Sequence, residues 1–152
     1  MKSMAVIAIG SRIMKDDGIG VWVAEAIKNH LNRISVDVVI AETDFEYGLD
    51  NARAYDYVII LDAMISGNEP GSITVCPLSR DEAQKRYASQ HDMSLIGMMV
   101  HEGNTSGSLI GIEAMDIDFG FGPGHTLRER FDEICGDVLT EILKIREGLT
   151  HA

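Results

Sequence analysis

Three side chains that can bind a divalent metal stand in three separate segments of the chain. Asp17 comes after the apolar run at residues 5–9, and Asp62 directly follows the apolar run at residues 57–61. His91 lies in a later polar stretch. Two carboxylates and one imidazole suit borderline divalent metals such as nickel, zinc, cobalt or manganese. With three protein ligands, one or more coordination positions stay open for water or substrate.

Each of these residues also has an ordinary structural explanation. Asp16 and Asp17 can stabilise the positive end of a following helix. Asp62 can end its strand by accepting backbone hydrogen bonds in a turn, and His91 can be a plain loop residue. His125 follows a Gly-Pro-Gly bend, where we expect an exposed loop side chain. The case for a site therefore depends on whether the elements of the fold bring the three candidates together.

Short apolar runs predict the strands that would do so, at residues 5–9, 36–40, 57–61, 72–75 and 108–114. The run at 57–61 is apolar on both faces, which is typical of a strand inside a parallel sheet. Apolar residues that recur every three or four positions predict amphipathic helices over 19–31 and from 127 to 145. Shorter helices are expected at 47–54, 79–87 and 93–100.

This alternation of strands and helices predicts an α/β fold in a single domain spanning residues 1–152. We expect a three-layer α/β/α sandwich whose twisted, mostly parallel sheet has about five strands. The strand order does not follow from the sequence. In open α/β sheets, ligands bind at the carboxyl ends of the strands. Asp17, Asp62 and His91 can all lie at that edge, so a shared metal site is the prediction.

Composition and charge exclude several other classes of function. Hydrophobic residues make up 45% of the 152 residues and charged residues 24%, an ordinary globular balance. The formal net charge of −11 disfavours nucleic acid and anionic membranes as partners. Cys76 and Cys135 form no CxxC motif, which favours two buried, reduced thiols in the cytoplasm. The glycines between residues 10 and 20 match neither a dinucleotide-binding nor a P-loop motif.

Four segments resemble, in order, the motifs of the nickel–iron (NiFe) hydrogenase maturation endopeptidases. Residues 9–20, Ile-Gly-Ser-Arg-Ile-Met-Lys-Asp-Asp-Gly-Ile-Gly, resemble the opening motif of that family. Residues 58–63, Val-Ile-Ile-Leu-Asp-Ala, resemble its second motif, an apolar strand that ends in Asp-Ala. Residues 89–92, Ser-Gln-His-Asp, resemble its third motif. The run at 109–113 and the glycine-rich loop after it resemble its last strand and loop.

The resemblance implies a fold, an activity and a partner. These enzymes remove a C-terminal extension from the precursor of the hydrogenase large subunit once nickel is in place. Members bind metal through two acids and one histidine, which on this chain are Asp17, Asp62 and His91, the implied catalytic and metal-binding residues. The implied nickel is delivered in the substrate, and another divalent metal can occupy the resting site. The implied fold is a twisted sheet between helices, in agreement with the periodicity.

Two segments depart from the family pattern. Ser11 replaces the usual Asn and is followed by Arg12. Residues 40–46, Ile-Ala-Glu-Thr-Asp-Phe-Glu, lack the glycines, the preceding acid and the Pro of the family's second loop. Because this loop is expected near the substrate, two alternatives stay open. One is a non-catalytic, metal-dependent docking or maturation factor for a hydrogenase subunit, and the other is a related metal-dependent peptidase with a different substrate.

Overall fold

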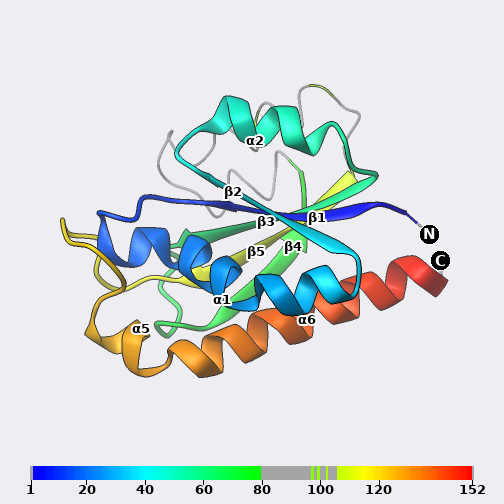
Figure 1. Ribbon diagram of the computed structural model, residues 1–152. Coiled ribbons are helices and arrows are strands. Elements are labelled where there is room, and N and C mark those ends of the chain that lie inside the picture. Colours follow the sequence, from blue (N-terminus) through cyan, green and yellow to red (C-terminus); the bar gives the residue numbers. More distant parts are fainter. Residues whose placement is uncertain (1, 80–96, 98, 100–101, 103–105, 152) are drawn as a thin grey trace.

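One five-stranded sheet forms the centre of the protein. Its strands are β1 (Met4–Ile9), β2 (Val36–Glu42), β3 (Tyr57–Met64), β4 (Ile73–Pro77) and β5 (Ser106–Glu113). The computed structural model, shown in Figure 1, describes residues 2–79, 97, 99, 102 and 106–151. The strand order is β2-β1-β3-β5-β4, and only β4 runs antiparallel to its neighbour.

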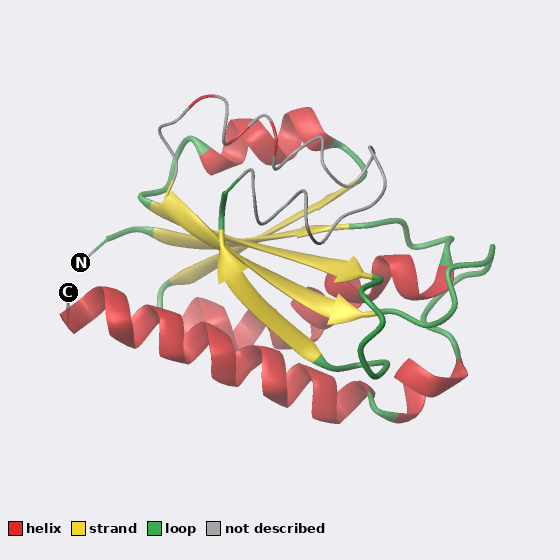
Figure 2. Ribbon diagram, turned by 180° about the vertical axis from the view of Figure 1, so that it is seen from behind, coloured by secondary structure: helices red, strands yellow, loops and turns green. Residues whose placement is uncertain are grey.

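Helices cover both faces of this sheet, as Figures 1 and 2 show from opposite sides. They are a 3₁₀ helix η1 (Lys15–Gly18), α1 (Ile19–Arg33), α2 (Phe45–Ala52), α5 (His125–Glu129) and α6 (Phe131–His151). Helices α1 and α6 pack on one face and α2 on the other. The predicted three-layer α/β fold with a mostly parallel sheet is therefore confirmed. None of the described helices is both long and apolar enough to cross a lipid bilayer.

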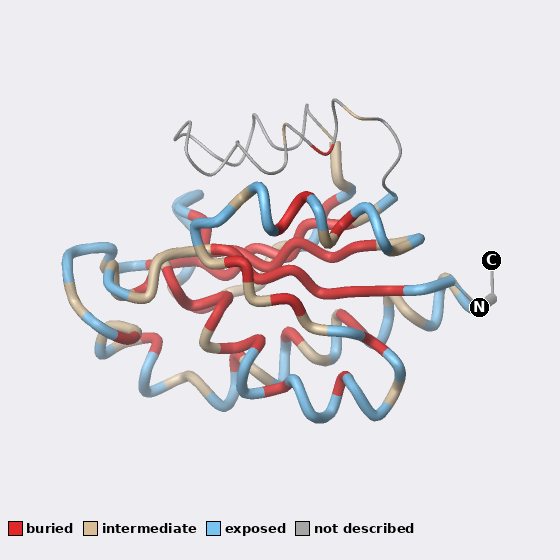
Figure 3. Tube along the Cα trace, turned by 45° about the horizontal axis from the view of Figure 1, so that its top comes forward, coloured by how far each residue is buried: buried red, intermediate tan, exposed pale blue. Residues whose placement is uncertain are grey.

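The central strands are buried on both faces, and this explains their unbroken apolar runs. Every residue of β1 is buried, and in β3 every residue after Tyr57 is buried. Successive residues of β1 pack on opposite faces of the sheet, because side chains along a strand point alternately to its two faces. Val6 packs in the cluster that includes α1 and α6, whereas Ile7 packs in the cluster that includes α2. Figure 3 shows this buried layer lying between more exposed helices.

Several element boundaries differ from the sequence expectations. Strand β3 runs three residues beyond the expected end at 61, because its residues from Asp62 to Met64 pair with β5 from Gly111 to Glu113. The expected closing helix is divided into α5 and α6, with a break at Arg130. The helix expected at 79–87 lies outside the described residues after position 79, and that at 93–100 is described only at 97 and 99.

The connections of β1 create a switch point in the topology. Helix α1 carries the chain from β1 to β2 on one side of β1, and α2 returns it past β1 to β3 on the other side. Ligands of open α/β sheets bind at the carboxyl ends of the strands where such a reversal occurs. The ends of β1 and β3 are thus the position at which this fold favours a site.

Candidate functional site

Asp62 lies inside β3, close to the carboxyl end of β1. It was expected directly after the strand, but the longer pairing with β5 places it opposite Gly111. Ala8 of β1 pairs with Leu61, so Asp62 stands one residue beyond that pair, level with the end of β1. The side chain is only 1% exposed, and its Oδ1 accepts a 2.8 Å hydrogen bond from the backbone N–H of Ala63. The sheet therefore fixes this carboxylate in place.

Asp17 is held by a tightly wound loop that follows β1. Its Oδ2 accepts a 2.9 Å hydrogen bond from the backbone N–H of Ser11. Gly10 has a φ of +132°, and a Cβ on it would lie 2.2 Å from the carbonyl oxygen of Asp17. Only glycine tolerates both the backbone conformation and the close approach. The Gly10–Asp17 contact explains why the opening segment has a glycine directly after the strand.

The start of α1 carries this loop to the side of Asp62. A Cβ on Gly20 would lie 2.7 Å from the carbonyl oxygen of Leu61 and 3.2 Å from the backbone nitrogen of Asp62. Helix η1, which contains Asp17, also contacts β3. The structure thus brings two of the three predicted residues to the same end of the sheet, Asp62 on the strand and Asp17 on the loop beside it.

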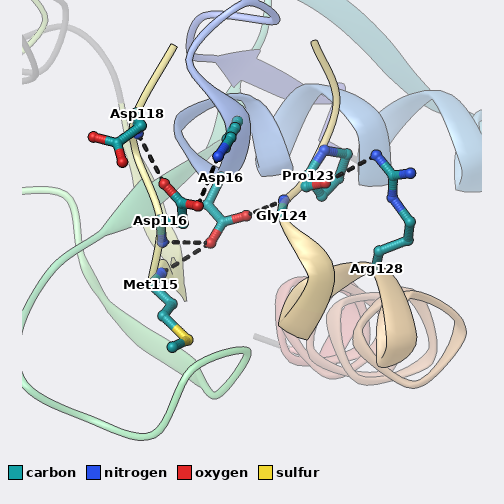
Figure 4. A network of polar contacts seen from close by, with 8 residues as sticks. Asp16, Met115, Asp116, Asp118, Pro123, Gly124 and Arg128 are labelled. Atoms are coloured by element: carbon teal, nitrogen blue, oxygen red, sulfur yellow. Dashed lines mark hydrogen bonds and ion pairs between the residues drawn. The ribbon is translucent and has the colours of Figure 1, made fainter. Parts of the chain in front are cut away.

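Asp16, the neighbour of Asp17, has a different role. It is 1% exposed, and its Oδ2 accepts backbone hydrogen bonds from Met115 at 3.0 Å and Asp116 at 2.8 Å. Its Oδ1 accepts a third, of 2.7 Å, from Gly124 (Figure 4). This carboxylate joins the loop after β1 to the loop after β5. Of the two adjacent acids, Asp16 therefore has a structural role, whereas Asp17 lies half-buried at the edge of the site.

The loop after β5, residues 114–124, is bound to the loop after β1 by further contacts. Lys15 forms a 2.9 Å ion pair with Asp116 and a 2.9 Å backbone hydrogen bond to the carbonyl of Gly120. The hydrogen bond from Lys15 lowers the pKa of the Asp116 carboxyl below its ordinary value. In turn, the N–H of Gly120 donates to the carbonyl of Ile13 at 2.8 Å. These contacts hold the two loops together as one structure.

Arg12 connects the same loop to the segment that departs from the family pattern. Its guanidinium forms ion pairs with Glu25 of α1 and with Glu42 at the end of β2. These pairs, with Glu25 contributing most, raise the pKa of Arg12 above its ordinary value. The guanidinium also lies 4.9 Å from the ring centre of Trp22, a cation–π contact. The two departures noted in the sequence, at Arg12 and at 40–46, are thus in direct contact.

The third predicted ligand, His91, lies outside the described residues. Within the described part of the chain, no group of three or more His, Cys, Asp or Glu side chains is placed to hold a metal ion. The oxygen donors that the structure does place, Asp17 and Asp62, are of the kind that divalent metals accept alongside an imidazole. A three-ligand site therefore requires a donor from beyond the described residues, as the prediction of His91 supposes.

The remaining histidine and cysteine expectations are mostly confirmed. His125 is 84% exposed and lies 3.1 Å from Glu129 on the surface of α5. Neither Cys76 nor Cys135, both in the described part, forms a disulfide. Cys76 is buried as expected, but Cys135 is only partly buried, because α6 leaves it at the margin of the core. Burial raises the pKa of the Cys135 thiol to about 11, so it is a poor nucleophile at neutral pH.

Comparison with protein families gives one match over most of the chain. A sequence model of the HycI hydrogenase maturation proteases matches residues 21–141. Asp62 lies inside this span, and Asp17 stands just before it. A search among curated protein sequences found no match.

Solved structures of similar fold include several maturation proteases. The hydrogenase maturating endopeptidase HybD from E. coli is 19% identical with a TM-score of 0.73, over 93% of this chain and 92% of that one. HybD from Thermococcus kodakarensis is 21% identical with a TM-score of 0.69, over 90% and 97%. The hydrogenase 2 maturation peptidase from a Thaumarchaeota archaeon is 17% identical with a TM-score of 0.67, over 93% and 96%. These likenesses confirm the fold over nearly the whole chain.

Proposed function

The chain belongs to the hydrogenase maturation protease family, and from this premise we propose that it removes the C-terminal extension of a NiFe-hydrogenase large-subunit precursor. The observation that carries the proposal is the placement of Asp17 beside the strand that holds Asp62, at the switch point of the sheet. Asp17 and Asp62, which we call the acidic pair, can bind at this position a metal that a protein partner presents. We place the reaction in the cytoplasm, where the two thiols stay reduced.

The division of roles between the adjacent acids supports Asp17 as the residue that meets the substrate. Both carboxylate oxygens of Asp16 are already engaged, because three backbone N–H groups donate to them. Asp17 is partly exposed, and its Oδ2 accepts a hydrogen bond from the backbone N–H of Ser11. A divalent metal approaching the edge of the sheet would therefore reach Asp17 rather than Asp16.

The backbone contacts of Asp17 and Asp62 orient both carboxylates before the substrate arrives. Ser11 and Ala63 each donate one backbone N–H to them, at 2.9 and 2.8 Å. Such preorganisation keeps reacting groups in position without an ordering cost at the moment of reaction. We propose that Asp17, Asp62 and His91 contact the nickel of the precursor and so position the peptide bond that is cut. Nickel, as part of the substrate, can polarise a carbonyl group or a water molecule.

The ion pair between Arg12 and Glu42 gives the second candidate function a specific basis. It occupies the place where this chain departs from the family pattern, at the end of β2. A substrate loop altered in this way is compatible with a docking or maturation factor that binds the nickel-bearing subunit without cutting it. It is also compatible with a peptidase whose substrate differs from that of the relatives. Both alternatives keep the acidic pair as the group that meets the metal.

The proposal is tested with the nickel-loaded large-subunit precursor from the same organism as this chain. The precursor is incubated with the full-length protein, and intact-mass spectrometry follows the loss of the C-terminal extension. We expect one cleavage product from the nickel-loaded precursor and none from the nickel-free one. No shortening of a precursor whose nickel content has been verified would contradict the proposal. A stable complex without cleavage would favour the docking factor instead.

A further inference from the structure

Exposed large apolar side chains gather around the candidate site rather than over the whole surface. Within the described part of the chain, those at this end of the sheet are Ile13, Ile65, Met115, Ile117, Phe119 and Phe121. Those elsewhere are Tyr47, Val75 and Leu143, which belong to three different elements. The most exposed are Phe119, at 77%, and Phe121, at 72%. We call Ile13, Phe119 and Phe121 the apolar ridge.

The apolar ridge is held rigidly by backbone contacts. The N–H of Gly120, between the two phenylalanines, donates to the carbonyl of Ile13 at 2.8 Å, and the N–H of Gly122 donates to the carbonyl of Arg12 at 3.2 Å. Phe121 also packs edge-on against Trp22, with ring centres 5.1 Å apart. Two exposed rings on an anchored loop bind a partner at low entropic cost, because little ordering is required on binding.

The apolar ridge is also physically continuous with the acidic pair. Ile13 and Asp17 belong to the same short loop after β1, and Asp16 binds the backbone of the loop that bears the phenylalanines. In Figure 1 both loops extend past the same end of the sheet. A protein segment that reaches Asp17 therefore meets the ridge as it does so.

Charge selects among the possible occupants. The chain carries a formal net charge of −11, so a second copy or an anionic membrane would be repelled. The border of the ridge itself carries both signs of charge, because exposed Asp118 precedes Phe119 while Arg12 precedes Ile13. The surface that fits is an apolar patch on a protein partner with charged side chains of both signs around it.

We propose that the apolar ridge docks the folded precursor of the large subunit, beside the segment that is cut. This inference rests on the proposed function and extends it, because it assigns recognition of the protein body to residues separate from the acidic pair. Phe119 is the anchor of this contact, since aromatic side chains that become buried at an interface carry much of its affinity.

The test compares the full-length protein with its Phe119→Ala and Phe119→Leu variants and with Leu143→Ala as a matched control. Leu143 is an exposed apolar residue on α6. Affinity for the nickel-loaded precursor is measured by biolayer interferometry and cleavage by mass spectrometry. We expect Phe119→Ala to raise both Kd and KM at least about tenfold while kcat is retained. Phe119→Leu should recover part of the lost affinity. The Kd and KM of Leu143→Ala should stay within about twofold of the wild-type values.

The outcomes separate this inference from the proposed function. Cleavage by the wild type with an unchanged Kd in Phe119→Ala would overturn the docking proposal and leave the protease function in place. Binding that depends on Phe119 without cleavage would support docking and contradict the protease function. A wild type that neither binds nor cuts would contradict both. A wild-type dimer that Phe119→Ala dissociates would assign the ridge to self-association and overturn the proposal.

Discussion

The carboxylate of Asp16 accepts a 2.7 Å hydrogen bond from the backbone N–H of Gly124, which stands 108 residues later in the chain. Together with the bonds from Met115 and Asp116, this contact closes the end of the sheet near the candidate site. The adjacent Asp17 is positioned by the same loop. We therefore regard Asp16 as the support of the site and Asp17 as a member of it.

Replacing Asp16 by Asn should destabilise the fold. The amide can accept at its oxygen, but its nitrogen faces a backbone donor, so at least one buried N–H loses its partner. We expect the free energy of unfolding to fall by about 2–4 kcal/mol, the cost of such a loss at a charged acceptor. Urea unfolding followed by circular dichroism measures the change. Asp137→Asn, on the exposed side of α6, is the control and should change stability by less than about 0.5 kcal/mol. Equal stability of the two variants would contradict the role of Asp16.

A glycine-to-alanine change should lower the stability of the protein at one helical position and raise it at another. At Gly20 the added Cβ would lie 2.7 Å from the carbonyl oxygen of Leu61, and neither backbone can yield. We expect a loss of about 1–3 kcal/mol of stability from this overpacking. At Gly136, in α6, nothing lies within 4 Å of the added atom, so alanine should stabilise the helix by about 0.5–1 kcal/mol. Chemical denaturation of both variants tests this, and a neutral Gly20→Ala would show that α1 does not press against β3 next to Asp62.

Much of this fold was predictable because its strands are buried on both faces. The apolar runs of β1 and β3 and the four-residue spacing of α1 belong to short stretches of chain, and local periodicity reveals them. The end of β3 was not predictable in the same way. The sequence predicts that the strand ends before Asp62. Pairing with β5, about fifty residues later in the chain, instead keeps Asp62 inside the sheet.

Local sequence patterns do not predict the contacts that shape the site. Nothing near Asp16 in the sequence indicates that its partners are Met115, Asp116 and Gly124. The ion pair between Arg12 and Glu42 likewise joins positions thirty residues apart. By contrast, Asp17 and Asp62 were predictable as candidates because strand ends are where α/β sheets bind ligands. The prediction of His91 stays a prediction, since that residue lies outside the described part of the chain.

The thiol of Cys135 should react slowly at ordinary pH. Burial raises its pKa to about 11, so the folded state keeps the proton over a range in which an unfolded thiol loses it. This difference in pKa stabilises the folded state fully at pH values below the unfolded pKa, near 9. The stabilisation is lost as the pH rises through about 11. Iodoacetamide labelling with peptide mass spectrometry should give a midpoint near 11 in the native protein. A native midpoint near 9, the unfolded value, would show that the side chain is not protected.

Loss of either carboxylate of the acidic pair should remove most of the cleavage activity while leaving the fold intact. We expect Asp17→Asn and Asp62→Asn each to lower the cleavage rate of nickel-loaded precursor by about 100-fold, the size of effect that misplacing a reacting group produces. Asp137→Asn, a charge change of the same kind far from the site, should leave the rate unchanged. A cleavage rate for Asp17→Asn equal to that of Asp137→Asn would exclude Asp17 from the site.

The central claim, that Asp17 and Asp62 act as one unit at the ends of β1 and β3, is tested most directly by a double-mutant cycle. Cleavage rates are measured for the wild type, Asp17→Asn, Asp62→Asn and the double variant. If the two carboxylates serve a single site, the double variant should be about as slow as the slower single variant, because the second loss removes nothing further. Losses that multiply to about 10⁴-fold would show that the two residues act independently and would contradict the shared site.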